Sequence, residues 1–311
     1  TILSLTINGQ TGDETVTVDD INTLPTFLST PVLMPDNAAV NGLPGLYFIG
    51  NGGANTLAFD LSQAGTEQLV GLGDGGTGAD NSAEVRSTDG TNTLNVYGSD
   101  LTSIVRVNGS ATGSLTVLAE DGDDLIDIAA DTLDPTTTNI TTAGYATINF
   151  SGDNFDALYL FGGLGMDDIT LTSFGSNQTN SPMIELDGDT ADDLGFPTSF
   201  DGAADTITVL STSGNTGLVA LYGGAGDDQF NVGGGDTTGI EGVVDTNGEG
   251  GSDTLNVDNS VSLTAQTVVV NEDQIDFITG VGATGDVTYN ETETLNVFTS
   301  AGDDIINVNF D

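Results

Sequence analysis

A glycine- and aspartate-rich turn followed by alternating apolar residues recurs along this 311-residue chain. It is clearest in VALYGGAGDDQFNV (219–232) and LYLFGGLGMDDITL (158–171). The same frame occurs at 46–59, 115–128 and 295–308, and its second half occurs alone at 12–18, 91–96, 204–209 and 252–257. After each turn the apolar residues lie two apart, as Phe230 and Val232 do, which is typical of half-buried strands. No segment has a convincing helical period, so the sequence predicts an all-β protein.

The copies are unequally spaced, as expected when the coils of a solenoid carry loops of different length. We therefore predict a parallel β-solenoid or β-helix with irregular repeats over residues 46–311. Residues 1–45 are interpreted as an N-terminal strand and a linker or wrapping arm, because they contain Pro25, Pro31, Pro35 and Pro44. Tandem antiparallel β-sandwiches are the alternative, since hairpins at the turns would give the same alternation.

The charge balance is extreme. The chain has 47 Asp and Glu residues against two Arg residues, has no Lys or His, and carries a formal net charge of -45. Clustered carboxylates repel one another unless cations offset them, and calcium is the natural counter-ion because it prefers oxygen ligands. Nucleic acid is not expected as a partner, because binding it requires Lys and Arg. Membrane insertion is not expected either, since no apolar run is long enough.

The turn itself brings oxygen atoms together. Glycine permits positive φ and lets carbonyl oxygens point into the turn, and aspartate adds a short carboxylate. Asp228 shares the phase of Phe230 and Val232 and is predicted to point inward, while Asp227 is predicted to point outward. Asp228 is therefore the better candidate for a metal ligand. The competing interpretation of any single copy is a solvent-exposed hairpin without a metal.

Two of the turns resemble the nonapeptide of hemolysin-type (RTX) calcium-binding repeats, Gly-Gly-x-Gly-x-Asp-x-(apolar)-x. GGAGDDQFN (223–231) and GGLGMDDIT (162–170) match at every defined position, and EDGDDLID, SAGDDIIN and GEGGSDTLN match in part. The longer frame is also similar to units of large secreted bacterial surface repeat proteins. The RTX resemblance implies a calcium-stabilised β-roll whose metal ligands are the sixth-position aspartates, here Asp124, Asp167, Asp228, Asp253 and Asp304. Further candidates in the same turns are Gly163, Gly224, Gly226, Asp123, Asp227 and Asp303.

This chain departs from the RTX family in one respect: its nonapeptides stand alone and not in tandem. Sites would then have to form between coils, or with loop carboxylates such as Asp187, Asp189, Asp192 and Asp193. The acidic loop that contains these four residues is also explained by solvation alone, because it lacks a full calcium-loop pattern.

The residue types restrict the possible chemistry. Without His, Cys or Lys, neither Ser-His-Asp nor Cys-His catalysis nor Schiff-base chemistry is available. We therefore predict that the protein is not an enzyme. The leading hypothesis is a secreted structural protein of the cell surface: a calcium-stabilised unit of a surface layer (S-layer), sheath, filament or large adhesin that self-associates. One alternative is a calcium-dependent adhesin module that binds a surface glycan or another surface such as ice. A second is a glycoside hydrolase that uses a carboxylate pair.

Overall fold

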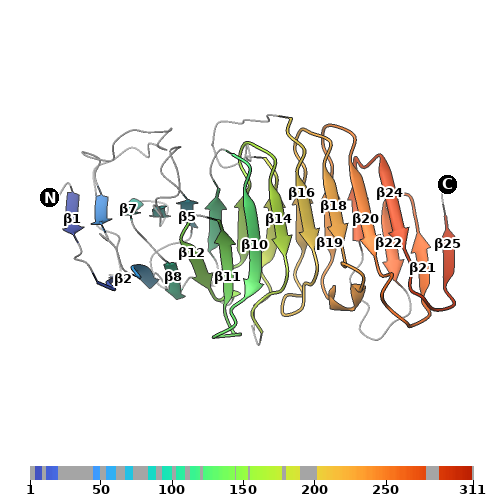
Figure 1. Cartoon of the computed structure of the whole chain (residues 1–311), viewed down its shortest axis with the longest axis horizontal. Coiled ribbons are helices and arrows are strands. Elements are labelled where there is room, and N and C mark those ends of the chain that lie inside the picture. Colours follow the sequence, from blue (N-terminus) through green and yellow to red (C-terminus); the bar gives the residue numbers. More distant parts are fainter. Residues whose placement is uncertain are drawn as a thin grey trace.

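The chain folds into β-strands arranged in two large sheets (Figure 1). The computed structural model describes residues 4–8, 12–19, 45–49, 54–60, 67–72, 83–88, 93–99, 103–108, 113–119, 122–143, 145–152, 155–176, 180–189, 202–277 and 287–309. Within these ranges there is no α-helix, and a 3-10 turn, η3, spans Thr237–Gly239. The predicted all-β class is therefore confirmed.

The first sheet, sheet A, has 14 strands among the described residues. In spatial order they are β1 (Ser4–Asn8), β3 (Gly45–Ile49), β7 (Thr93–Ser99), β6 (Ala83–Thr88), β5 (Glu67–Leu72), β9 (Ser114–Leu118), β13 (Ala157–Phe161), β15 (Met183–Asp187), β17 (Val219–Tyr222), β19 (Val244–Asn247), β23 (Val287–Asn290), β22 (Gln274–Phe277), β21 (Thr267–Val270) and β25 (Ile305–Val308).

The second sheet, sheet B, has 11 described strands. Their order is β2 (Thr15–Asp19), β4 (Thr56–Asp60), β8 (Ser103–Asn108), β12 (Thr147–Phe150), β11 (Thr138–Thr142), β10 (Leu125–Ala130), β14 (Asp168–Leu171), β16 (Thr206–Val209), β18 (Gln229–Val232), β20 (Thr254–Asp258) and β24 (Thr294–Phe298). Most neighbours pair in parallel, as β14, β16, β18 and β20 do. This pairing differs from the antiparallel sandwiches that were the alternative prediction.

The chain alternates between the sheets, so each pass through both sheets lies beside the previous one along the long axis, with the N and C ends of the chain at opposite ends (Figure 1). β1 and β2 pair with β3 and β4, and therefore belong to the same two sheets as the rest. The predicted linker or wrapping arm at 21–44 lies outside the described residues. No helix in the described part of the chain has the length and apolar character needed to cross a membrane.

The core lies between the two sheets and is built from apolar columns in register. One column of sheet B contains Ile126, Ile169, Ile207, Phe230 and Leu255, each at most 1% exposed. They belong to the same apolar cluster as the inward residues of sheet A, such as Leu158, Ile184, Val219 and Val244. Each fully buried side chain of this kind contributes about 1.5–3 kcal/mol. The alternating pattern of the sequence thus produces one continuous core.

Three antiparallel meanders interrupt the parallel order: β5–β6–β7, β10–β11–β12 and β21–β22–β23. They help to explain the unequal spacing of the turns. Asp228 and Asp253 occupy neighbouring turns and are 25 residues apart. Asp124 and Asp167 also occupy neighbouring turns, but they are 43 residues apart because the meander β10–β11–β12 lies between them.

The last complete copy of the frame is placed differently from the other complete copies. Its second half, β25, pairs with β21 in sheet A, whereas the second halves of the other complete copies, β4, β10, β14 and β18, lie in sheet B. Among the half-copies, the one at 91–96 also lies in sheet A, in β7. Ile306 and Val308 are 53% and 57% exposed, so their predicted burial is wrong. The reason is topological: among the described strands, sheet A continues through β22, β21 and β25, while sheet B ends at β24. β25 is an edge strand.

Candidate functional site

The candidate site is the stack of Gly/Asp turns that connect sheet A to sheet B. Each turn leaves a strand of sheet A and ends in an acidic residue directly before a strand of sheet B, as in the turn between β17 and β18. This acidic residue has the phase of the inward apolar residues, so the core-facing alternation turns it inward. Asp167, Asp228 and Asp253 are each at most 2% exposed, whereas Asp227 is exposed. The predicted difference between Asp228 and Asp227 is confirmed.

Each inward carboxylate ties its turn to the turn before it. Asp228 Oδ1 accepts a hydrogen bond from the backbone N–H of Asp205 at 2.8 Å, and Asp253 Oδ1 accepts one from Asp228 at 2.8 Å. The same contact joins Asp167 to Asp124 and Asp205 to Asp167, each at 2.8 Å. These hydrogen bonds satisfy backbone N–H groups of the residues directly before the sheet B strands, where regular strand pairing begins. They form a column of side-chain bridges along the molecule.

The outward aspartate of a turn makes the opposite connection. Asp227 Oδ1 accepts from the N–H of Ser252 in the next turn at 2.9 Å, and Asp123 Oδ1 accepts from Met166 at 3.0 Å. A consecutive pair of aspartates therefore binds the turn before it with one side chain and the turn after it with the other. This arrangement gives both aspartates a structural role that does not require a metal.

The first glycine of each turn makes room for the inward carboxylate. A Cβ atom added to Gly223 would overlap Oδ2 of Asp228, and the same holds for Gly162 with Asp167 and Gly248 with Asp253. The Oδ2 atoms therefore pack against glycine Cα atoms inside the turn. Any other residue at these positions would displace the carboxylate.

The second oxygen of each of these carboxylates lies where a negative charge is electrostatically unfavourable. Oδ2 of Asp167, Asp228 and Asp253 is buried and has no hydrogen-bond partner within the described part of the chain. Burial is the main cause that raises the pKa of Asp167 and of Asp228 to about 7. The hydrogen bond from the neighbouring turn opposes this effect, and the carboxylates above and below add to it. Burial also raises the pKa of Asp253. The column thus favours a proton or a cation near neutral pH.

The remaining predicted ligands take several positions. Asp124 lies in the same column, and its backbone N–H is the donor to Asp167. Gly163 and Gly224 have positive φ values of 108° and 86°. The N–H of Gly226 donates to the carbonyl of Gly250 at 2.7 Å, so Gly226 also connects neighbouring turns.

Asp303 and Asp304 lie in the turn before the edge strand β25 and are separate from the column, because β25 belongs to sheet A. Asp304 accepts hydrogen bonds from the Ser300 hydroxyl at 2.6 Å and from the Gln266 N–H at 2.8 Å. These bonds lower its pKa. Asp303 is exposed.

Some members of the column were not among the predicted metal ligands. Asp205 occupies the same position before β16, and Glu293 Oε2 accepts from the N–H of Asp253 at 2.7 Å. Asn55 takes the position before β4, where its Oδ1 accepts from the N–H of Glu14 at 3.2 Å. The signal that finds them is a carboxylate or amide two residues before the first inward apolar residue. The glycine pattern of the nonapeptide was too narrow a criterion.

The loop carboxylates are only partly described. Asp189 is buried, and its Oδ2 accepts from the N–H of Ala225 at 2.9 Å and packs against Gly224. Asp187 Oδ1 accepts from the N–H of Asp189 at 3.0 Å, and burial raises the pKa of Asp187 to about 8. Asp192 and Asp193 lie outside the described residues.

The turns offer only oxygen donors. Within the described ranges, no three acidic side chains converge closely enough to form a metal site alone. Main-chain carbonyls are close by, however: Asp167 Oδ2 and the Gly188 carbonyl both border the space beside the Gly162 Cα, and Asp253 Oδ2 and the Glu291 carbonyl border the space beside Gly248. A carboxylate with carbonyl oxygens is a hard donor set that suits calcium better than a transition metal.

No protein-family model, curated protein or solved structure matches the chain.

Proposed function

We propose that this chain is an extracellular structural protein, a calcium-stabilised parallel β-solenoid that serves as a unit of a surface layer, sheath, filament or large adhesin. The observation that carries the proposal is the column of buried aspartates. Three of its members, Asp167, Asp228 and Asp253, bridge two turns through one oxygen and keep a second buried oxygen without a hydrogen-bond partner in the described part of the chain. A cation bound at the turns would neutralise these oxygens and hold neighbouring coils together.

The whole-chain charge supports a cation as the stabilising ligand. A net charge of -45 opposes any compact state, and only two basic side chains are present to offset it. In the proposed sites, Asp167 acts with the Gly188 carbonyl and Asp253 with the Glu291 carbonyl, and water completes the coordination. Ions that bind only the folded chain stabilise it by mass action. The unit would then be loose where calcium is scarce and rigid outside the cell.

The ends of the sheets support self-association. β1 and β25 are the edge strands of sheet A among the described residues, and such edges are templates for further strand pairing. At the β25 end, Ile306 and Val308 are exposed, and Leu295 and Val297 of β24 are only partly buried. Exposed apolar residues at the end of the sheets favour end-to-end contact with another β-structure. This geometry supports the proposed assembly into filaments or lattices.

The carboxylate-pair hydrolase is less well supported. The aspartates of the column whose pKa is raised, Asp167, Asp228 and Asp253, are at most 2% exposed, so a polysaccharide has no access to them. A glycosidase requires two accessible carboxyl groups on either side of a sugar bond. The buried column has the properties of a structural element.

Thermal unfolding followed by circular dichroism tests the proposal. The melting temperature is measured at pH 7.5 in a chelator, in calcium and in magnesium, and electron microscopy is used to examine the same samples for filaments. We expect calcium to raise the melting temperature by many degrees, and Asp228→Asn to reduce this gain while Asp227→Asn reduces it much less. If calcium has no effect while acidification stabilises the chelated protein, protons and not calcium neutralise the column.

A further inference from the structure

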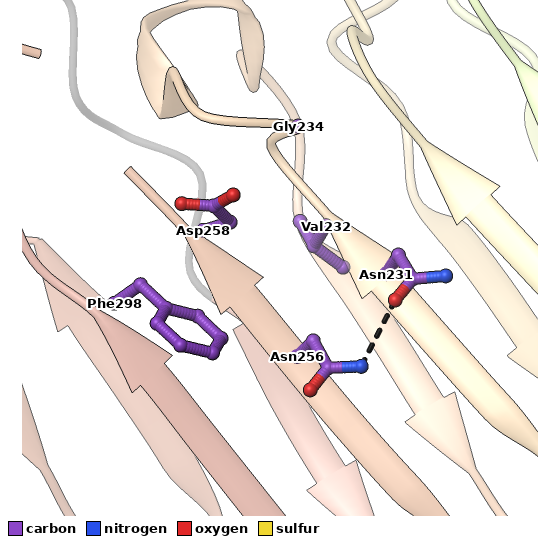
Figure 2. Close-up of a pocket in the computed structure, with 6 residues that line it drawn as sticks. All are labelled: Asn231, Val232, Gly234, Asn256, Asp258 and Phe298. Atoms are coloured by element: carbon purple, nitrogen blue, oxygen red, sulfur yellow. Dashed lines mark hydrogen bonds between the residues drawn. The ribbon is translucent and has the colours of Figure 1, made fainter. Parts of the chain in front are cut away.

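A shallow hollow of about 430 Å³ lies on the outer face of sheet B, toward the C-terminal end of the molecule (Figure 2). Its lining residues come from β18, from the turn after it, from β20 and from β24: Asn231, Val232, Gly234, Asn256, Asp258 and Phe298. This surface is separate from the aspartate column, which faces the interior of the turns. Nothing in the structural role of the turns requires the hollow.

The hollow results from the register of three strands. Phe298 on β24 pairs with Asp258 on β20, so their side chains are neighbours on the outer face. On the other side of β20 the chain runs through glycines 233–235, all with positive φ, which provide no side chains to fill the space. The side chain of Leu210 packs against Gly234 beyond them. An aromatic ring therefore borders an open space beside β20.

Phe298 is an unusual residue in this position. It is 48% exposed, whereas Phe150, Phe155, Phe161 and Phe230 are fully buried in the core. An exposed aromatic ring offers a flat apolar surface at a low cost in conformational entropy, because it has few rotatable bonds. Next to polar groups, such a ring is well suited to a ligand that has one apolar face and a polar edge.

The polar groups around the ring are fixed in orientation. Asn256 donates to Asn231 Oδ1 at 2.9 Å and accepts from Asn296 at 2.9 Å, and Asn231 in turn donates to Thr208 at 3.2 Å. Each amide nitrogen in this ladder has a second N–H that its ladder contact does not use. Asp258 Oδ1 accepts from the N–H of Ser260 at 2.9 Å, which holds the carboxylate in place and leaves Oδ2 able to accept another bond.

This combination selects the ligand class. Amide N–H groups donate, the Asp258 carboxylate accepts, and the ring of Phe298 provides an apolar surface. A sugar hydroxyl both donates and accepts, and a pyranose ring has an apolar C–H face. Anionic ligands are disfavoured by the carboxylate and by the net charge of -45. We propose that the hollow binds one ring of a neutral saccharide, which stacks on Phe298 and hydrogen-bonds to Asp258 and Asn256.

Saturation-transfer NMR on the whole chain tests this proposal. The probes are cellobiose, maltose, lactose and N,N′-diacetylchitobiose, with a glucuronate-containing disaccharide as the charged comparison. We expect transfer to ring C–H protons of at least one neutral probe and none to the charged one. Phe298→Ala should weaken binding about tenfold, which is the loss expected for one aromatic contact of about 1.4 kcal/mol. Phe298→Tyr should preserve it, and Asp258→Asn should weaken it.

Leu263→Ala provides the matched control, because Leu263 is 84% exposed and does not line the hollow. All variants are first compared by circular dichroism, so that loss of folding is distinguished from loss of binding. The experiment is run in calcium and in chelator. Binding to the folded chain in either condition supports the saccharide site, whatever the outcome for calcium. No transfer to any neutral probe, or equal transfer from wild type and from Phe298→Ala, would overturn it.

Discussion

Replacing Asp228 by asparagine separates the two functions of its carboxylate. Asparagine retains an oxygen that can accept from the Asp205 N–H, but it removes the negative charge. The chain already has an asparagine at the equivalent position of another turn: Asn55 is buried there and accepts a hydrogen bond from the N–H of Glu14. The substitution is therefore compatible with the fold. Its effect on stability depends on what neutralises Asp228 in the wild type.

The size of the expected change in stability follows from the pKa of Asp228. Burial raises the pKa of Asp228 from 3.8 to about 7, so in the absence of a cation its ionised form is destabilised by up to about 4 kcal/mol. A carboxyl with a raised pKa contributes stability fully below its unfolded pKa and loses it as the pH rises through the folded pKa. The wild type in chelator should therefore lose stability between about pH 4 and pH 7.

Urea unfolding of both proteins in chelator, at pH 5 and pH 8, measures this difference. We expect Asp228→Asn to be more stable than wild type by about 1–3 kcal/mol at pH 8, because part of the gain is lost in burying the amide, and nearly equal to it at pH 5. Asp227→Asn is the control and should change stability by less than about 0.5 kcal/mol, because Asp227 is exposed. The reasoning fails if wild-type stability is constant from pH 5 to pH 8, or if Asp228→Asn is the less stable protein at pH 8.

Three further predictions concern the turns and the core. Gly223→Ala should destabilise the protein by about 1–3 kcal/mol, because the added Cβ would overlap the Asp228 carboxylate. Gly250→Ala is the control and should be tolerated, since its Cβ would make only ordinary contacts. Equal melting temperatures for the two variants would contradict this prediction. Phe230→Ala should cost about 3–5 kcal/mol in denaturant unfolding and Ile306→Ala less than about 1 kcal/mol, because only the first is fully buried. Asp228→Ala should speed hydrogen exchange of the Asp205 backbone amide, because that amide loses its hydrogen-bond acceptor. The Ser252 amide, which donates to Asp227, should stay protected. An equal rise in exchange at both amides would indicate general unfolding.

Much of the fold could be predicted from local patterns. The two-residue period after each turn predicted strands with Ile169, Phe230 and Leu255 inside, and these residues are fully buried. The same period predicted that Asp228 points inward and Asp227 outward. The pattern failed for Ile306 and Val308, because burial requires a facing sheet as well as an alternating strand.

The candidate site was predictable only in part. The glycine-rich nonapeptide identified Asp167 and Asp228, but it missed Asp205, which follows Gly188 by 17 residues in the sequence, whereas Asp228 follows Gly223 by five. The nonapeptide pattern also did not explain why its first position must be glycine. A Cβ atom at Gly223 would overlap Oδ2 of Asp228, and this overlap depends on the conformation of the folded turn. Backbone partners in other turns, such as Ser252 for Asp227, cannot be read from a local motif.

The sequence by itself determined the strands, the inward and outward phase of their residues and the acidic character of the turns, because these depend on side-chain type and a period of two. The tertiary structure alone decided which turns are neighbours, since the meanders help to make the intervals between them unequal, from 23 residues to 43. It also decided that each aspartate bonds to a backbone amide of another turn and that its second oxygen is buried. Those contacts depend on the register between coils, which pairing across the whole sheet fixes.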